Sequence, residues 1–390
     1  MAAATVRLPS AEGGIAVHTF SGAPPFPETA APAATRLAFA AVHVTADPLA
    51  TRDPGSDACI DWDATLAFRR HVWGLGLAVA EVMDTAQRGM GLPWAQARQL
   101  IERSAAEARA VGGRIACGIG TDQLDPMRPT DPDAVIAAYL EQLEVAEAAG
   151  AQPIVMASRA LAACASGPDD YRRVYDAVLS QAGRPVVLHW LGAVFDPALE
   201  GYWGAPDRDG ATGVLLDLVA DHAPRIEGIK VSLLDLDHEV DLRRRVPSGV
   251  RVFSGDDFNF LELIRGDAQH HSDALLGIFD AAAPAAAAAL RCLDVGDVEG
   301  YERVLGPVVP LSRLLFAAPT RLYKTGIVFL AHLNGHQDHF RMLGGWESAR
   351  SVTHLADLVR LADAARLIAD PELAAARVAA IMSVAGVDQG

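Results

Sequence analysis

The sequence predicts an α/β protein, a (β/α)8 TIM barrel with a C-terminal helical extension. Short apolar runs alternate with longer amphipathic stretches, and this alternation repeats eight times along the chain. The apolar runs are continuous, as in residues 185–188 (PVVL), which is typical of parallel strands that helices cover. No Gly-x-Gly-x-x-Gly pattern follows the first run, so the sequence favours a closed barrel over an open dinucleotide-binding sheet.

Each apolar run has the length of one strand, and each amphipathic stretch has the length of one helix. Strands are predicted at residues 38–44, 78–83, 114–118, 152–156, 185–189, 227–231, 250–253 and 274–279. Helices are predicted at residues 62–74, 93–111, 131–149, 169–182, 212–222, 238–245 and 257–266, with another from about 281. This order places one helix after each strand, as a barrel of this type requires.

Three regions are expected along the chain. Residues 1–36 are predicted to form an irregular N-terminal cap, with a hairpin between 5–8 and 15–18 and a proline-rich run at 23–27. Residues 37–295 are predicted to form the barrel, which needs about 250 residues. Residues 296–390 are therefore interpreted as a helical extension that covers the barrel or builds an oligomer interface.

Composition indicates a globular protein that acts on a small-molecule substrate. The chain is 51% hydrophobic and 21% charged, with a formal net charge of −16 and no basic cluster, which argues against nucleic acid or an anionic membrane as partner. Neither a signal peptide nor an apolar span of roughly 18 residues is found, so a cytoplasmic location is expected. No CxxC spacing occurs, and reduced core positions are predicted for the four cysteines, Cys59, Cys117, Cys164 and Cys292.

Only two of the 33 cationic residues are lysines, Lys230 and Lys324. Lys230 ends the apolar run 226–230 (IEGIK), which is expected to be a buried strand. Burial lowers the pKa of an amine and frees its lone pair for attack on a carbonyl, which arginine cannot do. We therefore predict that Lys230 is a nucleophile. The alternative is a lysine that reaches solvent or pairs with Asp256, and Lys324 is interpreted as an ordinary helix lysine.

Several polar residues fall at predicted strand ends, where barrel enzymes carry their chemistry. They are His43, Asp47, Asp84, Thr85, His189, Lys230, Asp256 and Asp257. An imidazole such as His189 can relay protons near neutral pH, although a hydrogen bond to nearby backbone would equally account for it. Asp256 and Asp257 could instead cap the following helix, and capping is the favoured interpretation for Asp257.

Two of these strand ends, 226–230 (IEGIK) and 252–257 (VFSGDD), resemble the sixth and seventh strand ends of the dihydrodipicolinate synthase/N-acetylneuraminate lyase family of class I aldolases. Residues 60–63, 295–301 and 319–335 also resemble segments of that family. The resemblance implies that Lys230 forms an imine with a substrate carbonyl, that no cofactor is needed, and that the protein is a homodimer or homotetramer. Cleavage or formation of a carbon–carbon bond, or loss of water, would follow.

The chain departs from the family pattern at three places. His189 replaces the tyrosine that ends the fifth strand, Val194 lies nearest the position of a frequent arginine, and residues 84–88 (DTAQR) replace the Gly-Thr-Thr-Gly-Glu loop that holds a keto-acid carboxylate. Asp84 would repel such a carboxylate by ~1 to 4 kcal/mol at a separation of about 4 Å. These departures predict a substrate other than pyruvate.

Residues 190–204 mix aromatic rings with carboxylates, a combination that suits a hydroxylated, sugar-derived carbonyl compound. Trp190 would pack on the apolar face of such a compound. The expected roles are therefore catalysis by Lys230 and His189 and substrate binding by five residues, Thr85, Asp84, His43, Asp256 and Trp190.

Two other functions are compatible with the sequence. His332, His336 and His339 would share one face of a continuous helix, as ligands of a metal-dependent barrel isomerase or hydrolase, although Gly335 interrupts that helix. A catalytically inactive barrel that binds a sugar is the third interpretation. No metal is expected under the lysine mechanism.

Overall fold

The computed structural model describes residues 3–10, 12–22, 25–50, 58–125 and 130–390. The chain forms two compact units. One, the barrel unit, comprises Arg36–Val42 and Ala78–Leu276. The other, the helical unit, comprises Met1–Thr35, His43–Leu77 and Gly277–Gly390. The predicted limits of the cap, the barrel and the extension remain predictions.

The barrel unit contains eight parallel strands that close on themselves, in the order β10-β3-β4-β5-β6-β7-β8-β9. The strands are β3 (Ala38–Ala41), β4 (Ala78–Glu81), β5 (Ile115–Ile119), β6 (Gln152–Val155), β7 (Val186–Leu191), β8 (Ile226–Ser232), β9 (Arg251–Ser254) and β10 (Asp273–Leu276). Every predicted strand overlaps one of them, so the predicted TIM barrel is confirmed. The order follows the sequence because each strand pairs with the next one along the chain.

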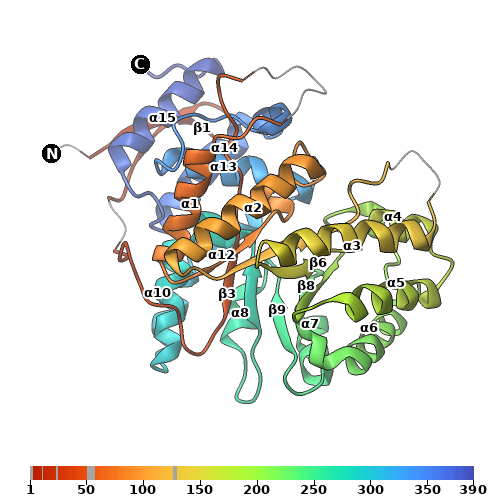
Figure 1. The fold of residues 1–390 in the computed structure, drawn as a ribbon. Helices are drawn as coiled ribbons and strands as arrows, with labels where there is room; N and C mark the ends of the chain where they lie inside the picture. The colour runs from red at the N-terminus through yellow and green to blue at the C-terminus, as the bar shows by residue number, and fades with distance from the viewer. Residues whose placement is uncertain (1–2, 11, 23–24, 51–57, 126–129) are drawn as a thin grey trace. The chain divides into compact units, whose positions relative to one another are not determined.

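The helices of the barrel unit follow its strands (Figure 1). They are α2 (Trp94–Val111), α3 (Pro132–Ala148), α4 (Arg159–Cys164), α5 (Pro168–Gln181), α6 (Arg208–His222), α7 (Leu236–Arg245) and α8 (Phe260–Arg265). Aspartates fix several starts: Asp131, Asp207 and Asp235 each accept a hydrogen bond from a free amide of the first turn. Three short 3-10 helices, η1 (Asp84–Ala86), η2 (Pro197–Leu199) and η3 (Ala223–Arg225), complete the unit.

The helical unit opens with an antiparallel hairpin of β1 (Thr5–Pro9) and β2 (Ile15–Thr19), so the predicted hairpin is confirmed. Asp363 fixes this segment by accepting hydrogen bonds from His18 at 3.1 Å and from the Ser21 amide at 2.9 Å. The other elements are α1 (Trp62–Gly74), α9 (Ile278–Ala281), α10 (Ala283–Asp294), α11 (Val298–Leu305), α12 (Val308–Leu315), η4 (Thr320–Leu322), α13 (Tyr323–Leu333), η5 (Leu343–Ser348), α14 (Val352–Ala364) and α15 (Pro371–Val384). The predicted C-terminal helices are thus confirmed.

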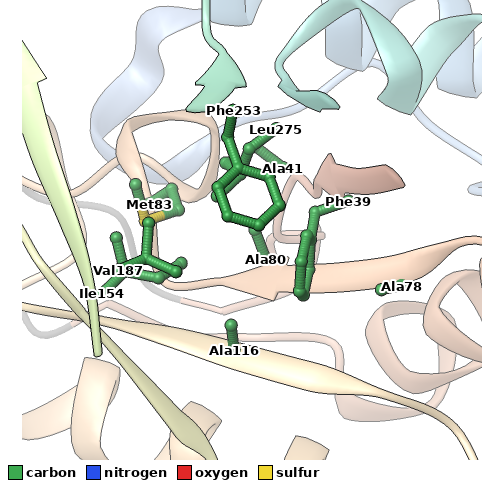
Figure 2. Packing of buried hydrophobic residues seen from close by; sticks show 10 residues of the cluster. All are labelled: Phe39, Ala41, Ala78, Ala80, Met83, Ala116, Ile154, Val187, Phe253 and Leu275. Atoms are coloured by element: carbon green, nitrogen blue, oxygen red, sulfur yellow. The ribbon is translucent and has the colours of Figure 1, made fainter. Parts of the chain in front are cut away.

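Alternate residues of the barrel strands fill the barrel interior (Figure 2). Phe39 and Phe253 meet there edge to face, with ring centroids 5.8 Å apart, and both are fully buried. Burying one such ring stabilises the fold by about 1.5 to 3 kcal/mol. Ile154 and Val187 belong to the same cluster, which identifies the interior face of β6 and β7.

Across the described ranges, no single helix has the length and apolarity needed to cross a membrane. The pair Val308–Leu315 and Thr320–Leu333, bent by 110°, meets that test by length and composition.

Candidate active site

Lys230 and His189 lie side by side on the interior face of the barrel. Val187 belongs to the interior cluster, and strand alternation puts His189, two residues further on, on the same face. His189 is the register partner of Lys230 across β7 and β8. Both residues stand near the carboxyl ends of their strands, which is where barrel enzymes hold their catalytic groups.

The amine of Lys230 is buried in the barrel without being neutralised by a direct ion pair. The residue is 8% exposed, and within the described part of the chain its amine makes no ion pair. Burial lowers the pKa of Lys230, while the negative charges of Asp257 and Asp84 act in the opposite direction. A lower pKa leaves more of the amine in the neutral form that attacks a carbonyl.

Gly255 lets Lys230 and Ser232 pack closely against the chain that follows β9. A Cβ atom at this position would lie 2.7 Å from Cε of Lys230 and 2.2 Å from Oγ of Ser232. Real Cβ atoms do not approach other atoms so closely, so only glycine fits without displacing both side chains. Gly255 is thus part of the site, a role that the sequence analysis missed.

His189 is held by a serine that the sequence analysis also missed. The Nε2 atom of His189 lies 3.1 Å from Oγ of Ser232, and its Nδ1 is buried with no hydrogen-bond partner in the described ranges. Burial, and then the positive charge of Lys230, lower the pKa of His189 well below its usual value. The imidazole is therefore neutral near pH 7.

Asp84 and Thr85 lie in η1, directly after β4. Thr85 is buried, and the charge of Asp84 reaches Lys230. Two residues with positive φ flank this turn, Val82 at 50° and Gln87 at 65°. Such angles are strained for a β-branched residue like Val82, so the surrounding structure must hold the turn in place.

Arg88 holds this turn in place through its hydrogen bonds. Its Nε donates to Asp122 at 2.9 Å, and its guanidinium also binds Gln142 at 3.0 Å and the Gly118 carbonyl at 3.2 Å. This buried arginine is therefore occupied by its protein partners. From the sequence, Arg88 stands out only as the last residue of the altered loop 84–88.

Asp256 and Asp257 have different surroundings, and the capping role that the sequence favoured for Asp257 belongs to Asp256. Asp256 accepts hydrogen bonds from the amides of Phe258 and Asn259, both at 2.9 Å, and from the Asn259 side chain at 2.8 Å. It thus stabilises the turn before α8, which was the role favoured for Asp257. The charge of Asp257 instead acts on Lys230, which adds Asp257 to the candidate site. Substrate binding by Asp256 stays a prediction.

Trp190 lies on the opposite face of β7 from His189. Its ring packs edge to face on His238 of α7 at 5.3 Å and on Trp203 at 6.3 Å. Because side chains alternate along a strand, a residue next to an interior one faces the helices. The predicted substrate contact of Trp190 is corrected accordingly.

His43 belongs to the helical unit, where it has its own partner. Its Nδ1 lies 2.8 Å from Oδ2 of Asp280, and its backbone amide donates to the same oxygen at 2.6 Å. The ring packs on Phe68 at 4.4 Å. His43 is fully buried, and these contacts give it a structural role, while its substrate contact stays a prediction.

The three tail histidines do not converge on a point. The Nδ1 of His332 lies 3.1 Å from the Gln337 carbonyl, His336 packs against His71 at 4.7 Å, and His339 accepts a hydrogen bond from the Arg341 amide. Helix α13 ends at Leu333, so they share no continuous helix face. Over the residues that the structure describes, no group of three or more His, Cys, Asp or Glu is arranged to hold a metal ion.

Lys324 lies in the first turn of α13, as expected for a helix lysine. Its amine donates to the Arg321 carbonyl at 3.3 Å and lies 5.2 Å from the centre of the Tyr323 ring. The two lysines of the chain thus have different surroundings. Lys230 faces the barrel interior, and Lys324 bonds a backbone carbonyl at the start of α13.

Solved structures share this fold over most of the chain. The prophage protein YagE from E. coli K12, a member of the dihydrodipicolinic acid synthase family solved with pyruvate, matches with a TM-score of 0.65 and 16% identity, covering 86% of this chain and all of that one, 100%. Dihydrodipicolinate synthase from Aquifex aeolicus matches with a TM-score of 0.63 and 13% identity, covering 86% of this chain and 99% of that one. A putative dihydrodipicolinate synthetase from Pseudomonas aeruginosa matches with a TM-score of 0.61 and 15% identity, covering 84% of this chain and 100% of that one.

These matches confirm the resemblance inferred from the strand ends, at the level of the fold. A search of curated proteins gave no match. The model of one family matches residues 6–387, nearly the whole chain. The chain therefore belongs to the family described as "Protein of unknown function (DUF993)".

Proposed function

We propose that this protein is a Schiff-base-forming lyase or aldolase that acts on a small carbonyl compound. The observation that carries the proposal is the position of Lys230, buried on the interior face of β8 with a lowered pKa and beside His189. The fold shared with dihydrodipicolinate synthases supports the same class of chemistry. A homodimer or homotetramer in the cytoplasm is part of this proposal.

The reaction begins when the neutral amine of Lys230 attacks the substrate carbonyl. Loss of one water molecule gives a neutral imine, and a proton taken up from solvent converts it to an iminium ion. The positive nitrogen of this ion withdraws electrons from the adjacent carbon–carbon bond. A base must then take a proton from the substrate as that bond breaks. His189 is neutral and lies on the neighbouring strand, so it is the proposed acceptor.

The substrate is proposed to be a hydroxylated, sugar-derived carbonyl compound in preference to pyruvate. Asp84 and Asp257 both place negative charge near Lys230, and a 2-oxo acid would bring a further carboxylate among them. Arg88 is held by Asp122 and Gln142, so it offers no free guanidinium for that group. Carboxylates suit substrate hydroxyls instead, because they accept hydrogen bonds.

Borohydride trapping tests the proposal, since it reduces an imine to a stable amine. With only two lysines in the chain, mass spectrometry can assign the adduct without ambiguity. Dihydroxyacetone should label Lys230 and leave Lys324 unlabelled, and pyruvate should label neither. Lys230→Arg should remain folded and unlabelled, because a guanidinium forms no imine.

Two results would count against the proposal in different ways. Labelling of Lys230 by pyruvate alone would contradict the substrate class and keep the mechanism. Turnover that persists in Lys230→Arg would contradict the mechanism itself.

A further inference from the structure

Ser232 is a buried polar residue of this site that contacts His189 and, like Lys230, packs beside Gly255. It lies two residues after Lys230 on β8, so both side chains share one face of the strand. It is 2% exposed, and its Oγ lies 3.1 Å from Nε2 of His189. Both Oγ of Ser232 and Cε of Lys230 pack over Gly255, where a Cβ atom would lie 2.2 Å and 2.7 Å from them.

We propose that Ser232 is a catalytic residue that exchanges protons with the imine-bound substrate and passes them to His189. This inference rests on the proposed function, because it concerns the step after Lys230 has formed the imine. It assigns two separate roles: Ser232 is the group that contacts the substrate, and His189 is the group that holds the proton.

The hydrogen-bonding capacity of the pair supports this division. A serine hydroxyl has one donor and two acceptor positions, and Ser232 uses one of them toward His189. When the hydroxyl donates to Nε2, its remaining lone pairs are available to a proton of the substrate. When Nε2 carries the proton, the hydroxyl is free to return one, so the pair works in both directions.

A substrate hydroxyl gives its proton to Oγ of Ser232 while the proton of Ser232 moves to Nε2 of His189. The electrons of the breaking carbon–carbon bond move to the iminium nitrogen, which yields a neutral enamine and a released carbonyl product. The reverse transfer then protonates the enamine carbon, and water hydrolyses the resulting imine to free Lys230.

Electrostatics couples enamine formation at Lys230 to protonation of His189, so that each favours the other. The positive charge on the Lys230 nitrogen is one of the causes that hold down the pKa of His189. Formation of the enamine removes that positive charge at the moment when His189 receives a proton. The number of buried cations between the two strands therefore stays constant through the step.

The test measures deuterium uptake by dihydroxyacetone in D2O, because enamine formation exchanges the hydrogens next to the carbonyl. Ser232→Ala should keep the borohydride-trapped adduct at Lys230 while the exchange rate falls by about 10²-fold or more, which is the usual contribution of a proton-transfer group. Ser232→Cys should recover part of the rate with an altered pH profile, since a thiol also transfers protons. Ser254→Ala is the matched control, because Ser254 lies on neighbouring β9 and bonds Glu239.

The outcomes separate the two proposals. Exchange that is unchanged in Ser232→Ala, with the adduct intact, overturns the relay and leaves the lysine mechanism standing. Loss of the adduct in both Ser232 variants also overturns the relay, because Ser232 would then be needed before the imine forms. No adduct in the wild-type protein overturns the lysine mechanism and the relay together.

Discussion

Gly255 and Lys230 approach so closely that no side chain fits between them. A Cβ atom on Gly255 would lie 2.7 Å from Cε of Lys230, although Gly255 does not adopt the positive φ that usually requires glycine. Packing against the lysine, and not the backbone conformation, thus demands glycine here. The strand end after β9 is shaped by the proposed nucleophile on β8.

Gly255→Ala should therefore impair the site more than the fold. The added methyl group displaces Lys230 and Ser232, so we expect borohydride labelling of Lys230 by dihydroxyacetone to fall at least about 10-fold, since small misplacements of reacting groups are costly. The free energy of unfolding should drop by about 1 to 3 kcal/mol. Gly213→Ala is the control, because a Cβ there meets no atom within 4 Å. Normal labelling of Gly255→Ala would contradict this packing argument.

Asp257→Asn should shift imine formation to lower pH. The charge of Asp257 raises the pKa of Lys230 against the effect of burial, so its removal lowers that pKa further and leaves more neutral amine at a given pH. The midpoint of a plot of labelling against pH should therefore move to lower pH. Asp256→Ala should leave this midpoint in place and cost about 1 to 2 kcal/mol of stability, because Asp256 holds the turn amides. Equal midpoints in the wild type and Asp257→Asn would count against the inferred electrostatic coupling.

Glu239→Gln should stabilise the protein at alkaline pH. Glu239 of α7 is 1% exposed and accepts from Ser254 at 3.2 Å; burial first, and then the charge of Asp256, raise its pKa from 4.5 to about 8. A raised carboxyl pKa means that its contribution to stability is full below pH 4.5 and is lost as the pH rises through about 8. Near pH 9, urea unfolding should therefore show Glu239→Gln to be more stable by about 1 to 3 kcal/mol. At pH 5 the difference should be small, and exposed Glu262→Gln should show no such pH dependence.

His336→Phe should reduce the sensitivity of the fold to acid. The ring of His336 packs on Phe68 at 4.9 Å and His71 at 4.7 Å, and burial, followed by the charges of His71 and His43, lowers its pKa from 6.5 to about 3. The stability that this neutral ring contributes is present above pH 6.5 and is lost as the pH falls through about 3.

Phenylalanine keeps the aromatic packing of His336 and removes its titration. Thermal unfolding at pH 4.5 should therefore show the variant to be more stable than the wild type by about 1 to 2 kcal/mol, with little difference at pH 7.5. His270→Phe, in an exposed loop, is the control. A loss of stability at both pH values would mean that packing, and not protonation, dominates.

The periodicity of the sequence determines the elements of the fold. The helix predicted over 62–74 coincides with α1 (Trp62–Gly74), because Asp61 caps its start by accepting from the Ala64 amide at 3.0 Å. The strand predicted over 38–44 ends earlier, at Ala41. The backbone amide of His43 donates to the distant Asp280 carboxylate, and no local pattern reveals such a partner.

The sequence also identifies Lys230 by itself, since an apolar strand holding one of two lysines is a local feature. Which of two adjacent residues faces the barrel interior is decided only by the tertiary structure. His189 faces inward and Trp190 outward, because a shift of one residue in strand register exchanges the two faces. Ser232 and Gly255 also belong to the site only through contacts with other strands, Ser232 with His189 and Gly255 with Lys230. Contacts of that kind arise only when the barrel closes.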